Sequence, residues 1–312
     1  MERMMPKFIC GTGDRTEWLA HRRRGIGGSD GAAILGIHPY RSRMDVYLEK
    51  LGIEANEDDA EREERMAWGS WMEPHVRGFY EKRTERTVRD HGILYQDENR
   101  PWLRVTTDGI IDGDDRGIGI LEAKATSSYA FRKHWSDGPP MWVKVQLYHG
   151  CLVMGARWGT VIVVTDGPPK WWDVEMDMDF VERVYLPELE AFWRCVETET
   201  PPEPDGSEAC KKALSALYRG EGWEDLEEEG ILNLGGEWLR FDEERQRLMD
   251  EQKGTKQKIE RMNQKIKAEM GKHGVAVLPD GTQYTWRKLH RNEYISKACD
   301  YDRLDRKAGK GD

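Results

Sequence analysis

Paired cysteines and long apolar segments are both missing from this sequence of 312 residues. The five cysteines are scattered and none belongs to a CxxC motif: they are Cys10, Cys151, Cys195, Cys210 and Cys299. This spacing argues against a disulfide framework and against a cysteine-based zinc site. No apolar run reaches membrane-spanning length, and the N-terminus does not have the pattern of a signal peptide. We therefore expect a cytoplasmic protein with free thiols and no membrane contact.

An excess of positive charge is also missing. The chain has 48 Lys and Arg against 58 Asp and Glu, which gives a net charge of −10. This balance argues against indiscriminate coating of nucleic acid. A basic site can still be concentrated locally, and the block His21-Arg22-Arg23-Arg24 shows such a concentration. Thirteen tryptophans indicate a substantial core, in one large domain or one domain with an appendage.

Helix and strand patterns alternate over residues 1–200, which we take as one domain. Its first helix carries Trp18 and Leu19, and a glycine-rich turn at 25–30 precedes a second helix with Ser29 or Asp30 as N-cap. A helix over 68–86 accommodates Pro74 only in its first turn. The other expected elements are strands at 92–96, 102–111, 117–125, 158–165 and 171–176, and helices at 141–155 and 179–197.

A change of composition marks the last third of the chain. The run ETETPPEPDGSE indicates a linker, which we place at 201–215. Apolar residues then recur every three or four positions from Leu234 to Ile266, as in a long amphipathic helix or a helical hairpin. Gln252, Gly254 and Thr255 interrupt this stripe, so we expect a helix that bends or docks on a partner. A small hairpin around residues 279–281 completes a mainly helical region at 216–312.

The segment LRVTTDGIIDGDDRGIGILEAKA, residues 103–125, reads as two β-strands joined by a turn rich in Gly and Asp. Asp108 falls in the first strand. Glu122 and Lys124 lie two residues apart in the second strand, so their side chains share a face. Two carboxylates beside an ammonium can bind Mg²⁺ and activate a water for phosphodiester hydrolysis. A solvated hairpin face is the alternative explanation of this pattern.

Three further features fit such a site, and each has a simpler alternative. Glu73, near the start of its expected helix, is a third carboxylate or an ordinary first-turn glutamate. Gln146 lies on an otherwise apolar helix and needs a hydrogen-bond partner, which the water or lysine of the site could supply. The alternative is that Gln146 is an ordinary surface amide. Arg22 precedes the glycine-rich turn and Ser29 lies near its end, so the two can form an anion site for a DNA phosphate. The alternative is an ordinary helix cap beside a surface arginine.

Together these pieces resemble the YqaJ-type viral recombinases, which are lambda-type alkaline exonucleases of the PD-(D/E)xK nuclease superfamily. The matching motifs, in order, are W-x3-R-x2-GIGGSD from Trp18, G-x3-E from Gly69, TDG from Thr107, LEAK from Leu121, and Gln146. They cover about residues 14–195. The resemblance implies an α/β fold with a mixed central β-sheet flanked by helices, the PD-(D/E)xK core.

The resemblance also implies roles for individual residues. Asp108 and Glu122, with the carbonyl of Ala123, would bind Mg²⁺, or Mn²⁺ in its place, and Glu73 would complete the site. Lys124 would activate the attacking water and Gln146 would help to position it. Arg22 and Ser29 would hold the 5′-phosphate. Two points stay open: Arg23 and Arg24 compete with Arg22, and Asp112 competes with Asp108 as the metal ligand, although the TDG match and the strand alternation favour Asp108.

For activity, the resemblance implies 5′–3′ digestion of linear double-stranded DNA in a bacterial host or prophage. The exposed 3′ strand would pass to a single-strand annealing protein, and a ring-shaped homotrimer would surround the DNA. The alternatives are another PD-(D/E)xK nuclease of DNA repair or CRISPR systems, and a catalytically silent protein that binds DNA ends. The intact Asp108, Glu122 and Lys124 argue against the silent protein.

Overall fold

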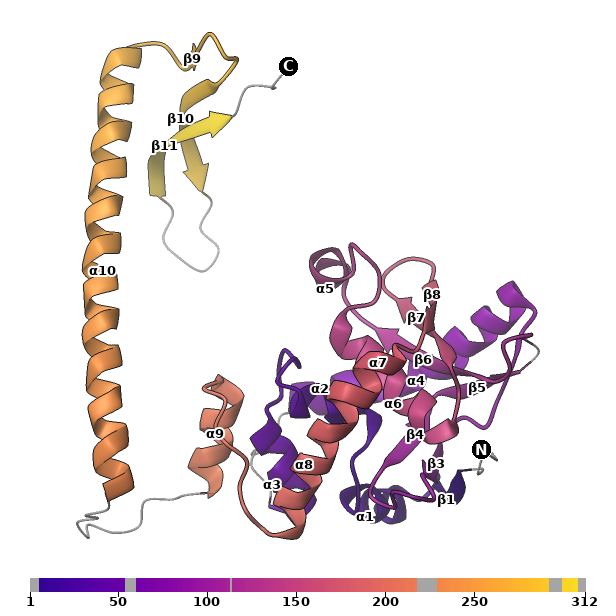
Figure 1. Ribbon diagram of the computed structural model, residues 1–312. Helices are drawn as coiled ribbons and strands as arrows, with labels where there is room; N and C mark the ends of the chain where they lie inside the picture. Colours follow the sequence, from indigo (N-terminus) through magenta and orange to yellow (C-terminus); the bar gives the residue numbers. More distant parts are fainter. Residues whose placement is uncertain (1–5, 54–59, 113, 218–228, 292–298, 308–312) are drawn as a thin grey trace. The chain divides into compact units, whose positions relative to one another are not determined.

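The computed structural model describes residues 6–53, 60–112, 114–217, 229–291 and 299–307. It divides the chain into two compact units, Met1–Glu221 and Gly222–Asp312. The first unit has a five-stranded mixed sheet with helices on both faces (Figure 1). The predicted α/β class, with a mixed central sheet flanked by helices, is confirmed.

The five strands of this sheet follow the order β2-β5-β6-β7-β8. Their bounds are Thr87–Arg89, Gly109–Asp112, Gly119–Ala125, Trp158–Val164 and Lys170–Glu175. β6 and β7 pair in parallel, and the other neighbours are antiparallel. All seven residues of β7 are buried, which is why its sequence WGTVIVV is apolar without alternation.

Two helices cover the two faces of the sheet: α4, Ala60–Thr84, and α6, Met141–Met154. Alternate residues of each strand point to opposite faces. Ile120 and Val161 therefore join the core around α6, whereas Leu121 and Ile162 join Val76 of α4 on the other face. The functional candidates of β6 lie at the end of this doubly covered strand.

A smaller antiparallel sheet, in the order β1-β3-β4, precedes the central one. Its strands are Lys7–Gly11, Ile93–Gln96 and Arg104–Thr107. The single strand expected at 102–111 is wrong, because the chain bends at Asp108 and continues as β5 in the other sheet. Gly109 permits this change of partner: a Cβ there would lie 2.2 Å from Val88 Cγ1.

Two predicted helix starts also differ from the structure. The N-cap of α2, Gly28–Ile34, is Gly27, not Ser29 or Asp30. Asp30 instead lies three residues into the helix, and its carboxylate accepts the Gly27 N–H at 2.9 Å. α4 begins well before Trp68, so Pro74 lies in its interior and not in its first turn. Because proline has no N–H, the carbonyl of Ser70, four residues earlier, has no helical donor. Ser70 is exposed, so water can donate to this carbonyl instead.

The first unit contains further helices besides α2, α4 and α6. They are α1 Arg15–Arg23, α3 Arg43–Leu51, α5 Ser128–His134, α7 Met178–Phe180, a π-helical turn Val181–Tyr185, α8 Leu186–Glu197 and α9 Glu208–Leu217. α9 occupies much of the expected linker at 201–215. It packs on α3 with Cys210 and Ala213 buried, so this stretch is part of the first unit.

The second unit contains one long helix, α10, Glu229–Met270, followed by a three-stranded antiparallel sheet (Figure 1). The strands are β9 Val275–Val277, β10 Gln283–Arg291 and β11 Cys299–Lys307. The hairpin expected around residues 279–281 joins β9 to β10. α10 continues through Gly254, so the region forms one long helix and not a helical hairpin. No described helix is long and apolar enough to cross a membrane.

Candidate functional site

The bend at Asp108 brings its carboxylate against β6. Asp108 Oδ2 accepts a hydrogen bond from the backbone N–H of Ala123 at 2.8 Å. Ala123 stands between Glu122 and Lys124, whose carboxylate and ammonium form an ion pair. The shared face predicted for Glu122 and Lys124 is therefore observed. The bend, which the sequence pattern did not predict, is what carries Asp108 to them.

Asp112, the rival of Asp108, lies elsewhere. Its Oδ2 is 2.5 Å from Nε of Arg89, on the neighbouring strand β2. Asp114, two residues further, pairs with Arg116 at 2.8 Å and Arg86 at 3.0 Å. The structure thus groups Asp108, and not Asp112, with Glu122 and Lys124.

Glu73 joins the cluster from α4. Burial raises its pKa to about 7, and the charge of Asp108 adds to that effect while Lys124 and Arg77 oppose it. Burial likewise raises the pKa of Glu122 to about 7, with Lys124 opposing and Asp108 adding. Because α4 begins at Ala60, Glu73 is far from the helix start and the first-turn explanation does not apply. These carboxylates therefore share one electrostatic environment.

A small cavity of about 40 Å³ lies at the same place. Its lining comes from α4, β6 and β7: Gly69, Met72, Glu73, Val76, Ala123, Lys124, Ala125 and Val164. The volume is sufficient for about one water molecule. A reacting water would here be close to both the ammonium of Lys124 and the carboxylate of Glu73.

The donor set fits a hard divalent cation. Glu122 Oε1 is buried, and the ammonium of Lys124 is paired with it. Carboxylate oxygens of this kind are ligands that Mg²⁺ and Mn²⁺ prefer. In the described part of the chain, no three His, Cys, Asp or Glu side chains are grouped closely enough to hold an ion by themselves. A cation here would thus also need main-chain carbonyls and water.

A second cluster forms around the first turn of α2. Arg22 Nη2 donates to Ser29 Oγ at 2.8 Å, and the guanidinium lies 5.3 Å from the ring centre of Trp18. Among the three consecutive arginines, Arg22 is therefore the one that contacts Ser29, whereas Arg23 and Arg24 are exposed. The turn between α1 and α2 brings these residues together, as the sequence predicted.

Sequence reasoning missed the ion-pair network behind this contact. The fully buried Asp30 pairs with Lys50 at 2.7 Å and Arg41 at 2.6 Å, and Arg22 lies 3.7 Å away. Glu49 pairs with Arg22 and Arg41. Burial acts to raise the pKa of Asp30, but the three cations hold it well below its usual range. Three cations against two carboxylates leave positive charge beside Ser29, which suits an anion.

Gln146 lies on the contact between α6 and α2. A Cβ on Gly28 would be 3.3 Å from Gln146 Cγ, so the glutamine packs against the residue next to Ser29. Among the described residues, no hydrogen bond joins Gln146 to Glu122 or Lys124. The structure thus places Gln146 beside the Arg22 cluster.

Lowering the pH from 8 to 6.5 is expected to stabilise the metal-free protein. The folded pKa values of Glu73 and Glu122, about 7, lie above their ordinary value of 4.5. The folded chain therefore binds more protons than the unfolded chain, and its free energy of unfolding falls as the pH rises through 7. With solvent screening of the partly exposed Glu73 allowed for, the change is about 1 kcal/mol.

Chemical denaturation at several pH values in EDTA measures this change. His149, whose pKa burial lowers to about 4, acts in the opposite direction below about pH 6.5. The Glu122→Gln variant keeps His149 and removes one of the two carboxylates, so its pH dependence should be weaker. Equal slopes for the two proteins would contradict the raised pKa of Glu122.

Comparison with known proteins identifies relatives of the first unit. Residues 17–157 match the family model described as the YqaJ-like viral recombinase domain. Protein YqaJ of Bacillus subtilis (strain 168) is 31% identical over 210 residues, which are 65% of this chain. The match spans only 63% of that relative's length.

Solved structures show a weaker likeness. The alkaline exonuclease LHK-Exo from Laribacter hongkongensis matches 65% of this chain and 100% of its own, with 20% identity and a TM-score of 0.48. The same protein in complex with dAMP gives the same values. The sequence match includes every candidate described above, from Arg22 to Gln146. Residues 17–157 of this chain therefore resemble the YqaJ-like viral recombinase domain.

Proposed function

We propose that the first unit is a Mg²⁺-dependent exonuclease, with Mn²⁺ as an alternative ion. It would digest linear double-stranded DNA from 5′ to 3′ and leave 3′ single strands for phage-type homologous recombination. The observation that carries this proposal is the grouping of Asp108, Glu122 and Lys124 at one bend, where the buried carboxylate of Glu122 is paired with the ammonium of Lys124. The match to the YqaJ-like domain supports it.

The residues would divide the chemistry as follows. Asp108, Glu122 and the main chain at Ala123 would hold the cation, which lowers the pKa of a bound water and neutralises phosphate charge. The pKa of Lys124 is raised by Glu122 and Asp108 against the effect of burial. Its ammonium is therefore protonated near neutral pH, where it orients water and stabilises negative charge. Glu73, with a pKa of about 7, suits proton transfer near neutral pH.

The DNA end would bind at the Arg22 cluster. Arg22, Ser29 and the N–H groups at the start of α2 would hold the 5′-phosphate, with Gln146 packed behind that turn. Two exposed tryptophans on α4 also support a nucleic-acid substrate. The rings of Trp68 and Trp71 lie 5.2 Å apart, a turn before Glu73, and unpaired bases can stack on such side chains. A ring-shaped trimer and a single-strand annealing partner belong to the proposal through the family resemblance.

A digestion assay tests the proposed activity. Linear duplex DNA should be degraded in Mg²⁺ and remain intact in EDTA, while closed circular DNA survives in both. Intact linear DNA in both Mg²⁺ and Mn²⁺ would contradict a nuclease and favour a silent end-binding protein. Equal cutting of circles would instead indicate another kind of PD-(D/E)xK nuclease.

Replacing Arg22 with alanine is expected to remove the preference for 5′-phosphorylated ends. A guanidinium–phosphate contact is charge-assisted, so its loss should lower the digestion rate of phosphorylated DNA by about 10- to 100-fold. DNA with a 5′-hydroxyl should be affected much less. The rates on both substrates measure this difference, and Arg23→Ala, which removes a neighbouring exposed guanidinium, is the matched control. A loss of equal size in Arg23→Ala, or on both substrates, would contradict the assignment.

A further inference from the structure

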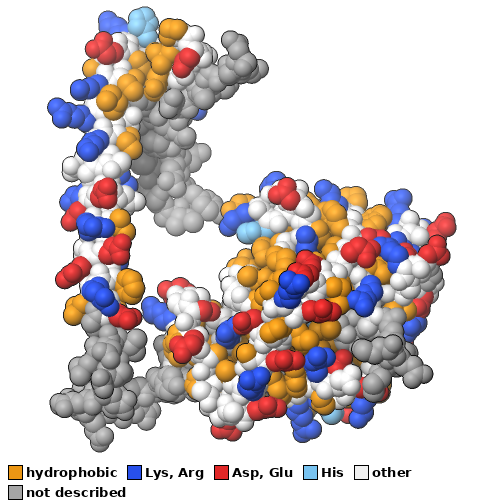
Figure 2. Space-filling model, in the orientation of Figure 1, with side chains coloured by type: hydrophobic (Ala, Val, Ile, Leu, Met, Phe, Trp, Pro, Cys, Tyr) orange, Lys and Arg blue, Asp and Glu red, His pale blue; other side chains and the backbone are white. Residues whose placement is uncertain are grey.

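Helix α10 exposes an apolar stripe along most of its length. Each of its main apolar side chains is more than half exposed: Trp238, Phe241, Leu248, Met249, Ile259 and Met262. Figure 2 shows hydrophobic side chains among blue and red ones along this helix. A 42-residue helix with such a face is typical of helices that pair with another helix.

All members of the stripe except Met249 fall on a seven-residue repeat. Positions 238, 241, 245, 248, 252, 255, 259 and 262 alternate in steps of three and four, as do the a and d positions of a coiled coil. The positions farthest from this seam are almost all polar: Arg240, Glu243, Gln246, Arg247, Asp250, Lys253, Gln257, Glu260 and Arg261. Only Leu239 and Gly254 depart from this division. The polar Gln252 and Thr255 therefore occupy seam positions and do not break the repeat.

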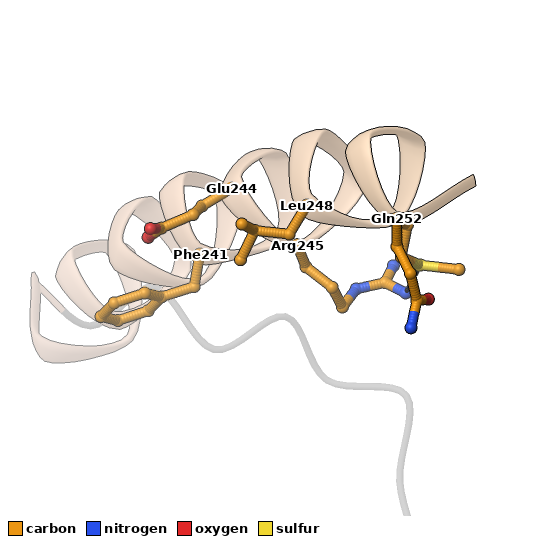
Figure 3. Close-up of a pocket in the computed structure, with 6 residues that line it drawn as sticks. Phe241, Glu244, Arg245, Leu248 and Gln252 are labelled. Atoms are coloured by element: carbon orange, nitrogen blue, oxygen red, sulfur yellow. Dashed lines mark hydrogen bonds between the residues drawn. The ribbon is translucent and has the colours of Figure 1, made fainter. Parts of the chain in front are cut away.

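The seam contains an open groove of about 460 Å³. Its lining residues are Phe241, Glu244, Arg245, Leu248, Met249 and Gln252. Figure 3 shows the labelled members of this set projecting from one side of α10. In the heptad these are neighbouring a, d, e and g positions, which form the holes that receive a knob from a facing helix. The groove thus has the shape that a second helix fills.

Charge along the edges of the seam identifies the orientation of that helix. At the g positions, Glu237, Glu244 and Glu251 are followed by Lys258 and Lys265. At the e positions, Asp242 precedes Lys256. Both edges are thus acidic in the first half and basic in the second. In an antiparallel pair g faces g and e faces e, so two copies of this sequence attract along both edges.

We propose that α10 pairs with α10 of a second copy of this chain as an antiparallel coiled coil. In this register Glu244 faces Lys258 of the second copy, Glu237 faces Lys265, and Asp242 faces Lys256. The seam then opposes Trp238 to Met262 and Phe241 to Ile259, while Leu248 meets Gln252. Each of these three charge pairs occurs twice in the symmetric dimer, which gives six attractive contacts. Glu251 faces Glu251 of the second copy near the twofold axis of the dimer, and this is the one like-charge contact along the edges.

The parallel arrangement is less favourable. It places Arg245 against Arg245 of the second copy in the seam, and Glu237 against Asp242 at its edge. Within one chain Asp242 pairs with Arg245 at 2.5 Å. That ion pair is exposed and weak, so Asp242 can exchange it for Lys256 of the second copy. The inference concerns the second unit alone and does not depend on the proposed nuclease activity.

Sedimentation of the full chain over a concentration series tests the pairing. The wild type should reach a species of twice the mass of that formed by Phe241→Asp, because the variant loses the α10 pairing and keeps any ring trimer. Glu244→Lys replaces two attractions by two repulsions and should weaken association by about tenfold. The double variant Glu244→Lys/Lys258→Glu should restore it. Glu243→Lys, the same charge change on the outer face, should have no effect.

Cross-linking tests the orientation. Met249 faces Met249 of the second copy in the antiparallel register, so Met249→Cys should form a disulfide-linked dimer under mild oxidation. Gln246→Cys, on the outer face, should not. A monomeric wild type, failure of the charge swap to restore association, or equal cross-linking of the two variants would each overturn the inference. Circular dichroism of every variant verifies that the helix is intact.

Discussion

Replacing Lys124 with alanine is expected to lower the rate of linear DNA digestion by at least about a thousandfold. The ammonium of Lys124 is paired with Glu122 and lines the small cavity beside Glu73. In the proposed site, two carboxylates would then face the phosphate, and neither water nor transition-state charge would be stabilised by a cation from the protein. The initial rate of release of acid-soluble nucleotides from linear duplex DNA in Mg²⁺ measures the loss.

Two further variants separate catalysis from folding. Glu122→Gln should also lose activity, because the amide is a poor ligand for the cation. Its free energy of unfolding should not fall at pH 8, since the substitution removes a buried negative charge close to Asp108. Lys253→Ala, an exposed lysine of α10, is the control and should retain full rate. Retention of more than a tenth of the rate by Lys124→Ala would contradict the proposed role.

Local pattern was sufficient to predict much of the central sheet. The apolar run at β7 and the turn between β5 and β6 are signals carried by adjacent residues, and the structure has both elements. Helix α6 was predicted almost to the residue for the same reason. These elements are buried on the faces that their sequence periodicity indicates.

The bend at Asp108 could not be predicted in this way. The residues around it are β-prone, and the change of sheet depends on the approach of Val88 to Gly109, two segments twenty-one positions apart in sequence. The position of Pro74 is a similar case. The burial of Val76 and Tyr80 against the sheet stabilises α4 beyond the point where local propensity would end it.

In the candidate site too, contacts between residues close in sequence could be predicted, whereas contacts made by tertiary packing could not. Glu122 and Lys124 are neighbours on one strand, so spacing alone placed them together. Arg22 and Ser29 needed only the turn between two helices. Lys50 carried no such signal, because a charged residue in an amphipathic helix is normally solvated. Arg41 lies in the loop before α3, where its sequence neighbours do not indicate burial. Only the packing of α3 on α2 reveals that Lys50 is buried against Asp30.

That buried ion pair gives the largest expected effect on stability. Asp30→Asn should reduce the free energy of unfolding by about 3–5 kcal/mol. The side chains of Asp30 and Lys50 are fully buried, and Arg41 is 11% exposed. Asparagine keeps the shape of the aspartate but not its charge, so a buried ammonium and a guanidinium lose their main counter-charge. Urea denaturation of the full chain at neutral pH measures the change.

An exposed ion pair in the same unit provides the matched control. Asp179 lies 2.8 Å from Arg183 on the surface, and Asp179→Asn should cost less than about 1 kcal/mol. Adding Lys50→Met to Asp30→Asn should recover part of the loss, because the uncompensated ammonium is then removed. If Asp30→Asn costs no more than Asp179→Asn, the network does not stabilise the fold. If it costs several kcal/mol, the position of Arg22, which lies 3.7 Å from Asp30, depends on the same buried charge that stabilises α2 and α3.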